Sequence, residues 1–320
     1  MPIKLRDYQE EALFAVDQSP DQRIYNPYIE LPTGSGKTII FGEGARRRGC
    51  RTLIFAHTDE LIQQAYDKLH TVWPEAEIGI VKADRNEVDA EVIIGSVQTL
   101  SRPARLRELK KDFGFIVTDE VHHSAAPSYL RIYDYFELPR KETLSLGVTA
   151  TPFRGDRKPL EAFSGPVYRK LIKEMIEAGW LCDLRGIAVD TSIDLDEVRM
   201  FGEDFLESDL SRVVNSPNRN ELIVEAYLKY ARDRKLTLCF TVDVQHALDL
   251  AETFREAGIS AEAIHGKMGV EERRKILERF HNQETKVITN CQVLTEGYDE
   301  PGIDCIILGR PTMSILLHYQ

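Results

Sequence analysis

The chain of 320 residues is poor in cysteine and contains no long apolar run. Its five cysteines are odd in number and far apart, with no CxxC pair, so they indicate neither a zinc site nor a disulfide framework. No apolar run reaches the roughly 18 residues that a membrane span requires, and the first residues lack the apolar core of a signal peptide. These absences predict a protein without a membrane partner, in a reducing cytoplasmic compartment.

An excess of basic residues is also missing. The chain has 41 Lys and Arg against 52 Asp and Glu, which gives a formal net charge of −11. A protein that coats nucleic acid nonspecifically usually carries a basic face. The charge therefore argues against indiscriminate nucleic-acid binding and leaves open a localised site formed by particular loops.

The length predicts about two domains, each with its own core. In the first half, apolar runs alternate with helical patterns, which is typical of an α/β fold with a doubly wound, mostly parallel sheet. The apolar runs occupy 52–56, 78–81, 92–94, 115–117 and 144–148, and helical patterns occupy 60–72 and 104–111.

From about residue 163 to 220 the pattern weakens and becomes acidic, apart from a helix predicted over 171–178. We therefore predict a first domain over 1–165, an acidic connector over 166–219 and a second domain over 220–320. The second domain shows another alternating set, with helices predicted over 220–234, 244–257 and 270–281 and strands over 236–241, 261–264, 286–289 and 304–308.

A glycine-rich loop is the first candidate site. It follows an extended run over 26–31 and opens a helix predicted over 37–48. Strand, glycine loop and helix form the setting of a P-loop, whose backbone N–H groups meet phosphate at the positive end of the helix. Lys37 would contact the β- and γ-phosphates and Thr38 would contact Mg²⁺, above a cradle formed by Thr33, Gly34, Ser35 and Gly36. Leu31 stands where the strict pattern has glycine, and a surface turn is the alternative interpretation.

Two adjacent acids form the second candidate site. Asp119 and Glu120 follow an apolar run over 113–117. A carboxylate at the C-terminal end of a buried strand can hold magnesium, and its neighbour can activate a water. Alone, such a pair could be a solvated helix start. Its place downstream of a P-loop predicts a nucleoside triphosphatase instead.

These two stretches resemble motifs I and II of the superfamily 2 helicases, the second in its DExH form, Asp119-Glu120-Val121-His122. The resemblance implies two RecA-like domains with Mg-ATP between them. It assigns Asp119 to Mg²⁺, Glu120 to the attacking water and His122 to sensing of the γ-phosphate. The run 147–154 is similar to motif III, which implies that Thr149 and Thr151 couple the nucleotide to the nucleic acid.

Two further stretches resemble nucleotide motifs of the same superfamily. The run 5–12 resembles the segment that reads adenine, which assigns Arg6 and Gln9 to the base. A glutamine amide can donate to one adenine nitrogen and accept from another, and this match favours ATP over GTP. The run 293–302 is similar to motif V, which implies that Gly297 and Asp299 face the nucleotide from the second domain.

Several strand ends match the nucleic-acid motifs of the superfamily. Backbone N–H groups and hydroxyls at such ends can meet phosphates without a large positive charge, which reconciles an acidic protein with a nucleic-acid partner. Asp59 and Glu60 would repel a phosphate, so we expect them to serve a helix dipole instead. The resemblance assigns to nucleic acid Thr58, Gly95, Ser96, Gln98 and Thr99 in the first domain and Thr241, His265 and Gly266 in the second.

Within the superfamily the chain looks most like the RadD-type and restriction-translocase-related DNA helicases. In these enzymes Arg310-Pro311-Thr312-x-Ser314 leads into motif VI, which should begin at Gln320, where this sequence ends. An arginine of the kind that motif VI supplies is worth about 10³–10⁵ in rate. The chain is therefore expected to bind ATP and to hydrolyse it poorly.

The expected function is that of an ATP-dependent helicase or translocase, with DNA favoured over RNA as partner. The first alternative is an RNA helicase of the same fold. The second is an ATP-gated DNA-binding module without motor activity. The third is the motor subunit of a restriction system, which would need a nuclease as protein partner. The sequence leaves polarity, substrate structure and oligomeric state open.

Overall fold

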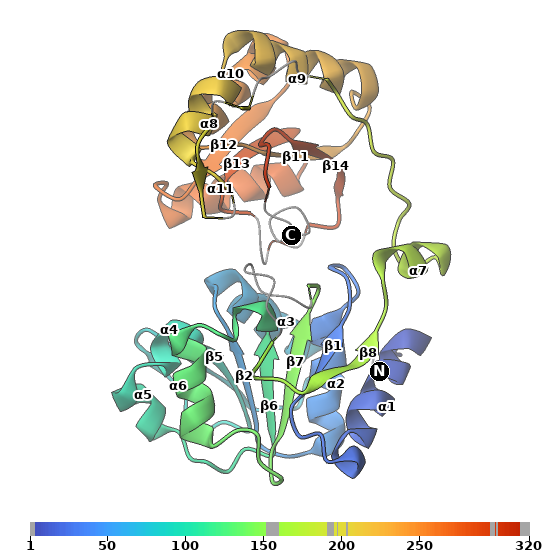
Figure 1. Ribbon diagram of the computed structural model, residues 1–320, viewed down its shortest axis with the longest axis vertical. Coiled ribbons are helices and arrows are strands. Elements are labelled where there is room, and N and C mark those ends of the chain that lie inside the picture. The colour runs from blue at the N-terminus through green and yellow to red at the C-terminus, as the bar shows by residue number, and fades with distance from the viewer. Residues whose placement is uncertain are drawn as a thin grey trace. The chain divides into compact units, whose positions relative to one another are not determined.

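The computed structural model describes residues 4–151, 160–190, 195–196, 198–202, 204–294, 298 and 300–313. The chain divides into two compact units, Met1–Leu184 and Arg185–Gln320 (Figure 1). Each unit is an α/β structure around its own sheet, so the predicted α/β class is confirmed.

The first unit is built on an eight-stranded sheet in the order β4-β3-β5-β2-β6-β7-β1-β8. Every neighbouring pair runs parallel except β3 and β4, which run antiparallel. The strands are β1 (Pro27–Glu30), β2 (Thr52–Ala56), β3 (Ile78–Lys82), β4 (Arg85–Asn86), β5 (Val92–Ser96), β6 (Phe115–Asp119), β7 (Leu144–Thr149) and β8 (Gly165–Arg169).

Helices cover both faces of this sheet, as the crossovers between parallel strands require. The helices are α1 (Asp7–Gln18), α2 (Lys37–Arg48), α3 (Asp59–Val72), α4 (Val97–Leu100), α5 (Pro103–Glu108), α6 (Pro127–Phe136) and α7 (Ile172–Glu177), with 3₁₀ turns η1 (Pro20–Gln22) and η2 (Val121–His123).

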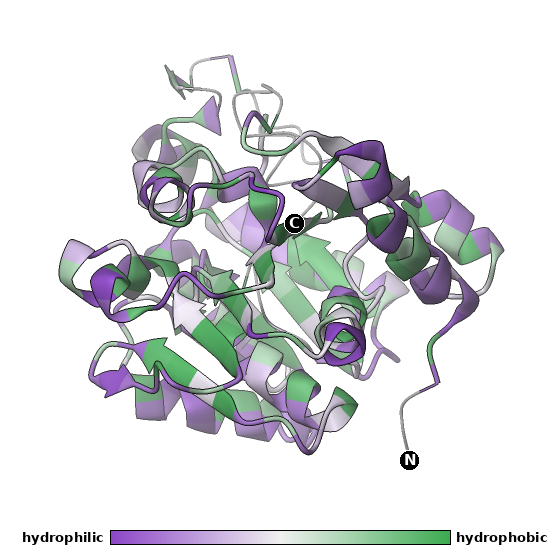
Figure 2. Ribbon diagram, turned by 90° about the horizontal axis from the view of Figure 1, so that it is seen from below, coloured by the Kyte–Doolittle hydropathy of each residue, from purple (hydrophilic) through white to green (hydrophobic). Residues whose placement is uncertain are grey.

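The core of the first unit has two layers, one on each face of the sheet. Alternate residues of β2 belong to opposite layers, since successive side chains of a strand point to opposite faces. Ile54 packs in the layer under α1, α2 and α3, and Phe55 packs in the layer under α4, α5 and α6. Because both faces are buried, the central strands β2 and β5 are mostly apolar, and the strands in Figure 2 are largely green.

Strand register brings three predicted site segments to the same edge of this sheet. Glu30 of β1 pairs with Thr149 of β7, and Asp119 of β6 pairs with Val148 of β7. The glycine loop leaves β1 at this edge, so the loop, the acids and the threonines lie at the carboxyl ends of three neighbouring strands. This edge is where open parallel sheets bind ligands.

The second unit contains a four-stranded parallel sheet in the order β12-β13-β11-β14. Helices α9 and α10 pack on one core cluster and α11 packs on another. The elements are β9 (Met200–Phe201), β10 (Asp204–Phe205), α8 (Glu207–Val214), α9 (Pro217–Tyr230), β11 (Leu236–Phe240), α10 (Val244–Glu256), β12 (Ala261–His265), α11 (Val270–His281), β13 (Val287–Cys291) and β14 (Ile303–Leu308).

Most predicted elements are present. The helices predicted over 37–48 and 270–281 match α2 and α11 at both ends. The region predicted as a connector contains β8, which pairs with β1 in the first sheet, and α8 in the second unit. The sequence prediction missed these two elements, α6 and short strands that include β4, β9 and β10. Within the described ranges, no helix combines the length and the apolar character that crossing a membrane would require.

Candidate nucleotide-binding site

The glycine loop folds back over the first turn of α2. Gly34 and Gly36 adopt φ values of 80° and 76°, which L-amino acids seldom adopt. A Cβ on Gly36 would also lie 2.9 Å from Nε2 of Gln9. The first turn of α2 contains no acidic side chain that would compete for its positive end. The loop therefore has the backbone that a phosphate cradle needs.

Ser35 ties this loop to α1. Its carbonyl accepts hydrogen bonds from Tyr8 Oη at 2.6 Å and from Gln9 Nε2 at 3.2 Å. The Ser35 hydroxyl is buried and has no hydrogen-bond partner among the described residues. A buried polar atom of this kind normally has a partner. A phosphate group in the loop would supply one, so this residue fits the predicted ligand.

Lys37 lies between the start of the loop and the acid pair. Its ammonium donates to the Leu31 carbonyl at 3.4 Å and lies 4.0 Å from Oε1 of Glu120. The Lys37 side chain is mostly buried. Its charge therefore faces the end of β6, where Asp119 and Glu120 lie, so the glycine loop and the two acids belong to one candidate site.

Asp119 is a buried acid in an unfavourable setting. Its carboxylate accepts the backbone N–H of Glu120 at 3.0 Å and forms no ion pair within the described part of the chain. Burial, and then the negative charge of Glu120, raise the pKa of Asp119 to about 7, and Lys37 offsets this only in part. A divalent cation would reverse the shift. The Asp119 carboxylate and the Thr38 hydroxyl would both offer oxygen atoms as ligands, which suits Mg²⁺.

Glu120 is held in a strained backbone conformation. Its φ of 49° and ψ of 59° lie in the left-handed region, although it is not glycine. Such a residue costs about 1–3 kcal/mol, and residues of this kind cluster at active sites. Its carboxylate lies between two partners, with Oε1 near Lys37 and Oε2 at 3.3 Å from Nδ1 of His122.

A chain of polar contacts continues from His122 to β7. Nδ1 of the buried His122 lies 3.4 Å from Oγ1 of Thr149. The Thr149 hydroxyl donates to the Thr151 carbonyl at 2.8 Å and accepts the Thr151 N–H at 3.0 Å. The structure thus connects Glu120 to the segment predicted to act in coupling. The rest of that segment, 152–154, lies outside the described residues.

The predicted base-reading residues form part of α1 and its cap. Gln9 Oε1 accepts the backbone N–H of Arg6 at 3.0 Å, while Gln9 Nε2 donates to Ser35. Each end of the amide keeps one further hydrogen-bonding position. Arg6 Nη1 donates to the Tyr8 hydroxyl at 3.3 Å. The sequence prediction missed Tyr8, although a tyrosine beside Gln9 that packs in a core needs a partner for its hydroxyl.

The residues predicted to contact nucleic acid in the first unit lie at the ends of β2 and β5. Thr58 caps α3 by accepting the N–H of Leu61 at 3.2 Å, and Asp59 and Glu60 occupy the first turn of that helix. Gln98 Nε2 donates to the His57 carbonyl at 2.6 Å and its Oε1 accepts from Ser96 Oγ at 2.7 Å.

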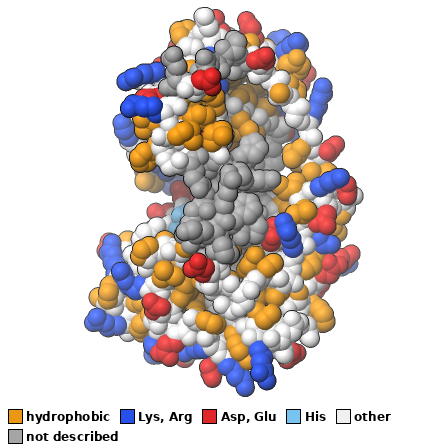
Figure 3. Space-filling model, viewed as in Figure 1, with side chains coloured by type: hydrophobic (Ala, Val, Ile, Leu, Met, Phe, Trp, Pro, Cys, Tyr) orange, Lys and Arg blue, Asp and Glu red, His pale blue; other side chains and the backbone are white. Residues whose placement is uncertain are grey.

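Two further predicted contacts of this unit have internal roles. Thr99 Oγ1 accepts the N–H of Ala83 at 3.1 Å. A Cβ on Gly95 would come within 2.4 Å of Leu100, so packing alone accounts for that glycine. Most of these side chains thus already have partners within the unit, and their nucleic-acid role stays a prediction. Figure 3 shows acidic and basic side chains mixed on its visible face.

In the second unit, Thr241 is buried and donates to the Asn290 carbonyl at 2.9 Å. His265 and Gly266 lie at the end of β12, with Gly266 exposed and open space around its α-carbon. Gly297 and Asp299, which the resemblance assigns to the nucleotide, lie outside the described residues. So do Ser314 and Gln320, and the predicted weakness of hydrolysis stays a prediction.

Two protein-family models match separate parts of the chain. The model described as type III restriction enzyme, res subunit, matches residues 2–154. The model described as helicase conserved C-terminal domain matches residues 218–320.

Curated relatives extend along nearly the whole chain. It is 37% identical over 334 residues to the putative ATP-dependent helicase IRC3 of Saccharomyces cerevisiae, covering 99% of this chain and 48% of that protein. It is 27% identical over 342 residues to the DNA 3'-5' translocase XPB2 of Sulfurisphaera tokodaii, covering 93% of this chain and 73% of that protein. The chain thus spans about half the length of the yeast relative.

Among solved structures, the ATP-dependent type ISP restriction-modification enzyme LlaBIII bound to DNA is similar with a TM-score of 0.68 at 16% identity, covering 97% of this chain and 26% of that one. This likeness shows the fold. Family models and relatives agree with the motifs at the strand ends, and on these grounds the chain belongs to the superfamily 2 helicases.

Proposed function

We propose that the chain is the ATP-hydrolysing part of a DNA helicase or translocase. One observation carries the proposal: the chain of contacts from Lys37 through Glu120 and His122 to Thr149, beside the buried Asp119. An ordinary surface turn would need neither a strained glutamate nor a buried aspartate without an ion pair. The relatives are named ATP-dependent helicase and DNA translocase, which supports the same activity.

Each residue of the site has a proposed part in ATP hydrolysis. The loop from Thr33 to Gly36 and the Lys37 ammonium hold the phosphates, and Thr38 and Asp119 hold magnesium. Magnesium, when bound, supplies positive charge to the phosphate oxygens. Glu120 accepts a proton from the attacking water, and its carboxylate is kept in position by Lys37 and His122.

His122 is the proposed start of the coupling between ATP and nucleic acid. Its Nδ1 faces both Glu120 and Thr149, so a change in the charge of Glu120 alters the hydrogen bond that His122 offers to Thr149. We propose that this change reaches Thr151 and the segment after it. Closure of the two units on ATP and reopening after hydrolysis would then move the protein along a strand.

Two substitutions test the assigned roles. Lys37→Ala should weaken ATP binding, because the ammonium contacts phosphate in the ground state. Glu120→Gln should keep binding and lose hydrolysis, because the amide accepts a proton far less readily. Glu142→Gln changes an exposed glutamate before β7 and serves as the matched control. Binding is measured with a fluorescent ATP analogue and hydrolysis by release of phosphate in a single turnover. Equal loss of binding in Lys37→Ala and Glu120→Gln contradicts the assignment.

DNA is the proposed partner because the archaeal relative is named a DNA translocase. Single-stranded DNA should stimulate ATP hydrolysis more than RNA of the same sequence. Stronger stimulation by RNA would favour the RNA-helicase alternative. ATP-dependent DNA affinity without strand displacement would favour an ATP-gated binding module.

The name of the first family model gives the restriction alternative a specific basis. The motor subunit of a restriction system would translocate on DNA that carries the recognition site of its nuclease partner. Translocation on DNA without such a site, by the isolated chain, contradicts that alternative.

A further inference from the structure

The last segment of the first unit returns to the glycine loop. After β8 the chain forms α7, and Met175 of that helix is buried in the core layer under α1 and α2. The Met175 carbonyl accepts the N–H groups of Trp180 at 2.8 Å and Leu181 at 3.1 Å. These bonds fix the chain just before the boundary of the unit at Leu184.

Trp180 lies against the residues that fasten α1 to the loop. Its ring centroid is 5.5 Å from that of Tyr8 in an edge arrangement, and the Arg6 guanidinium lies 5.3 Å from the Trp180 ring centroid. Tyr8 in turn donates to the Ser35 carbonyl at 2.6 Å. A single side chain therefore separates the indole from the backbone of the phosphate cradle.

Leu181 lies near the loop at Gly34. A Cβ on Gly34 would lie 3.4 Å from Cδ2 of Leu181, which is ordinary van der Waals contact. Leu181 is also partly buried against the core layer that contains Leu31, where the loop begins. Gly34 has a left-handed φ of 80°, so its conformation belongs to the cradle itself. A movement of Gly34 toward Leu181 would therefore bring the loop against this side chain.

A small cavity lies beside Trp180 and Tyr8. A cavity of about 90 Å³ borders the ring, and its remaining walls come from α1 and from the segment 170–178. Ligand pockets usually measure about 300–1,000 Å³, so this cavity is smaller than a typical ligand pocket. The Trp180 side chain is 37% exposed. The indole therefore borders open space as well as Tyr8 and Arg6.

We propose that Trp180 and Leu181 sense the nucleotide in the glycine loop and transmit its state to the point where the chain leaves the first unit. This rests on the proposed function, because it requires that the loop binds ATP. Binding that moves the loop changes the surroundings of Trp180, and by thermodynamic linkage a change at Trp180 alters nucleotide affinity. Trp180 acts through Arg6 and Tyr8 and is a positioning residue.

The two tryptophans of the chain, Trp73 and Trp180, allow a direct test. Trp73 ends α3, before β3 begins, and Trp180 lies beside the glycine loop. In Trp73→Phe, Trp180 is the single reporter. Its emission should change on addition of magnesium with a non-hydrolysable ATP analogue, and the change should saturate at the dissociation constant that calorimetry gives.

The matched control is Trp180→Phe, in which Trp73 is the reporter and the emission should stay constant. Adding Lys37→Ala to the Trp73→Phe variant should move the Trp180 response to higher nucleotide concentration. Calorimetry without any binding would contradict the proposed function. Calorimetric binding with an unchanged Trp180 emission overturns the sensing role alone.

Affinity gives the reciprocal measurement. Trp180→Ala removes both ring contacts and should weaken nucleotide binding about three- to tenfold, given the size of aromatic and cation–π contacts. Trp180→Phe keeps a ring against Tyr8 and Arg6 and should recover most of the affinity. Equal affinity in wild type and Trp180→Ala, with both folded by circular dichroism, contradicts the proposal.

Discussion

Asp119 in the first unit and two partly buried acids in the second unit differ in whether they have an ion pair. In the first unit Asp119 is 6% exposed and has no ion pair within the described residues. In the second unit Asp204 lies 2.9 Å from the Arg310 guanidinium, and the Glu262 carboxylate receives two hydrogen bonds from Arg279. A buried ion that lacks a partner costs several kcal/mol, so a protein keeps one where function requires it. The contrast separates a ligand site from structural ion pairs.

Burial alone does not make this difference. Glu30 in the first sheet is 5% exposed, yet its carboxylate lies 3.0 Å from Nε of Arg169. Burial raises the pKa of Glu30, and Arg169 opposes that shift. For Asp119 the opposing influences include Lys37 and His57, neither of which forms an ion pair with it within the described residues. The lack of an ion pair among the described residues therefore distinguishes Asp119 from Glu30, and this comparison can be tested by substitution.

The largest effect is expected from Asp119→Asn. This change removes the proposed magnesium ligand and should lower ATP hydrolysis by about 10²–10³-fold. It should not lower stability, because it also removes a buried charge without an ion pair. Phosphate release is measured with magnesium and thermal unfolding without it, both on the same preparation. A large loss of stability would show that Asp119 is a structural residue and would break the comparison.

The second effect is the pH dependence of stability without magnesium. Asp119 has a pKa of about 7 in the folded chain and an ordinary value of 3.8, so the folded state binds more protons between these values. Stability that depends on this group must then fall as pH rises from about 4 to 7, by at most about 1.4 kcal/mol per pH unit.

The measurement for this effect compares urea unfolding of wild type and Asp119→Asn at several pH values in EDTA. The stability of wild type relative to the variant should decrease as pH rises. Saturating magnesium should reduce this decrease, because a bound cation favours the carboxylate. A relative stability that increases with pH would mean that Asp119 has a cationic partner.

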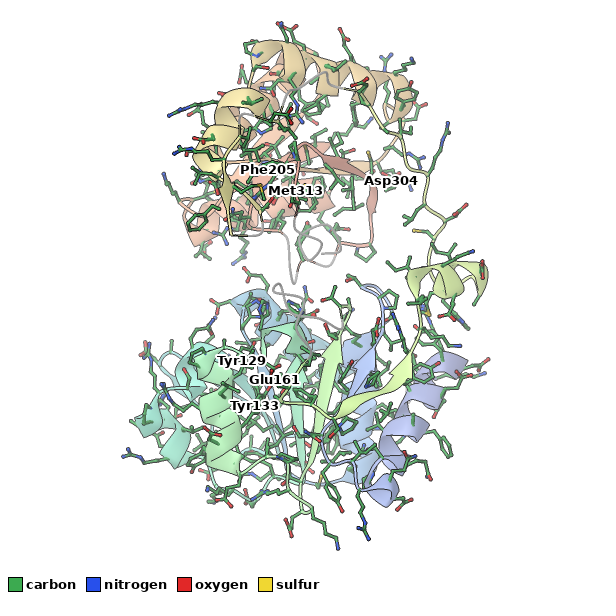
Figure 4. The ribbon with its side chains drawn as sticks, viewed as in Figure 1. Tyr129, Tyr133, Glu161, Phe205, Asp304 and Met313 are labelled. Carbon is green, nitrogen blue, oxygen red and sulfur yellow. The ribbon has the colours of Figure 1, made fainter. Side chains whose placement is uncertain are left out.

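Asp204→Asn tests the opposite case in the second unit. Asp204 accepts from Arg310 and from the Thr312 hydroxyl at 3.0 Å, and its Oδ1 accepts the Met313 N–H at 2.9 Å. Figure 4 labels Met313 and the neighbouring Phe205. The substitution leaves the Arg310 charge partly buried and should destabilise the chain by about 2 kcal/mol. Chemical unfolding measures this loss, and an unchanged stability would contradict a structural role for the pair.

The sequence predicted the positions of the glycine loop and the two acids in the fold, because these residues lie close together in the chain or end neighbouring strands. The loop from Thr33 to Thr38 and the helix after it follow from glycines that permit left-handed backbone and from the apolar run before them. Asp119 could be placed because its own apolar strand precedes it. The coupling role of Thr149 and the assignments to nucleic acid stay predictions, since no ligand contact tests them.

The sequence could not predict contacts that depend on the path of the chain in space. Trp180 meets Tyr8 because β8 returns to the sheet beside β1, and β8 is a half-exposed edge strand without a clear alternation. Helix α6 had a signal that was missed. Its buried residues Tyr129, Ile132, Tyr133 and Phe136 have the spacing of one helical face, and Figure 4 labels the two tyrosines.

The smallest effect is expected from Glu262→Gln, and its pH dependence has the opposite sign from that of Asp119. The hydrogen bond from Arg279 is the main cause that lowers the pKa of Glu262 below its ordinary 4.5. The ion pair then stabilises the chain above pH 4.5, and this stabilisation is lost as pH falls through the lower folded pKa. Because the Glu262 side chain is 27% exposed, solvent screening limits the cost of the substitution to about 0.5–1 kcal/mol at pH 7.

Urea unfolding from pH 6 to pH 3 should show this cost decreasing toward zero, whereas the cost of ionising Asp119 grows as pH rises. The same unfolding curves therefore distinguish Glu262, whose ion pair stabilises the fold, from Asp119, whose ionised carboxylate destabilises the fold until a cation binds. If stability changed with pH in the same direction for both acids, the difference between them would come from burial. The main physical argument for Asp119 as a magnesium ligand would then fail.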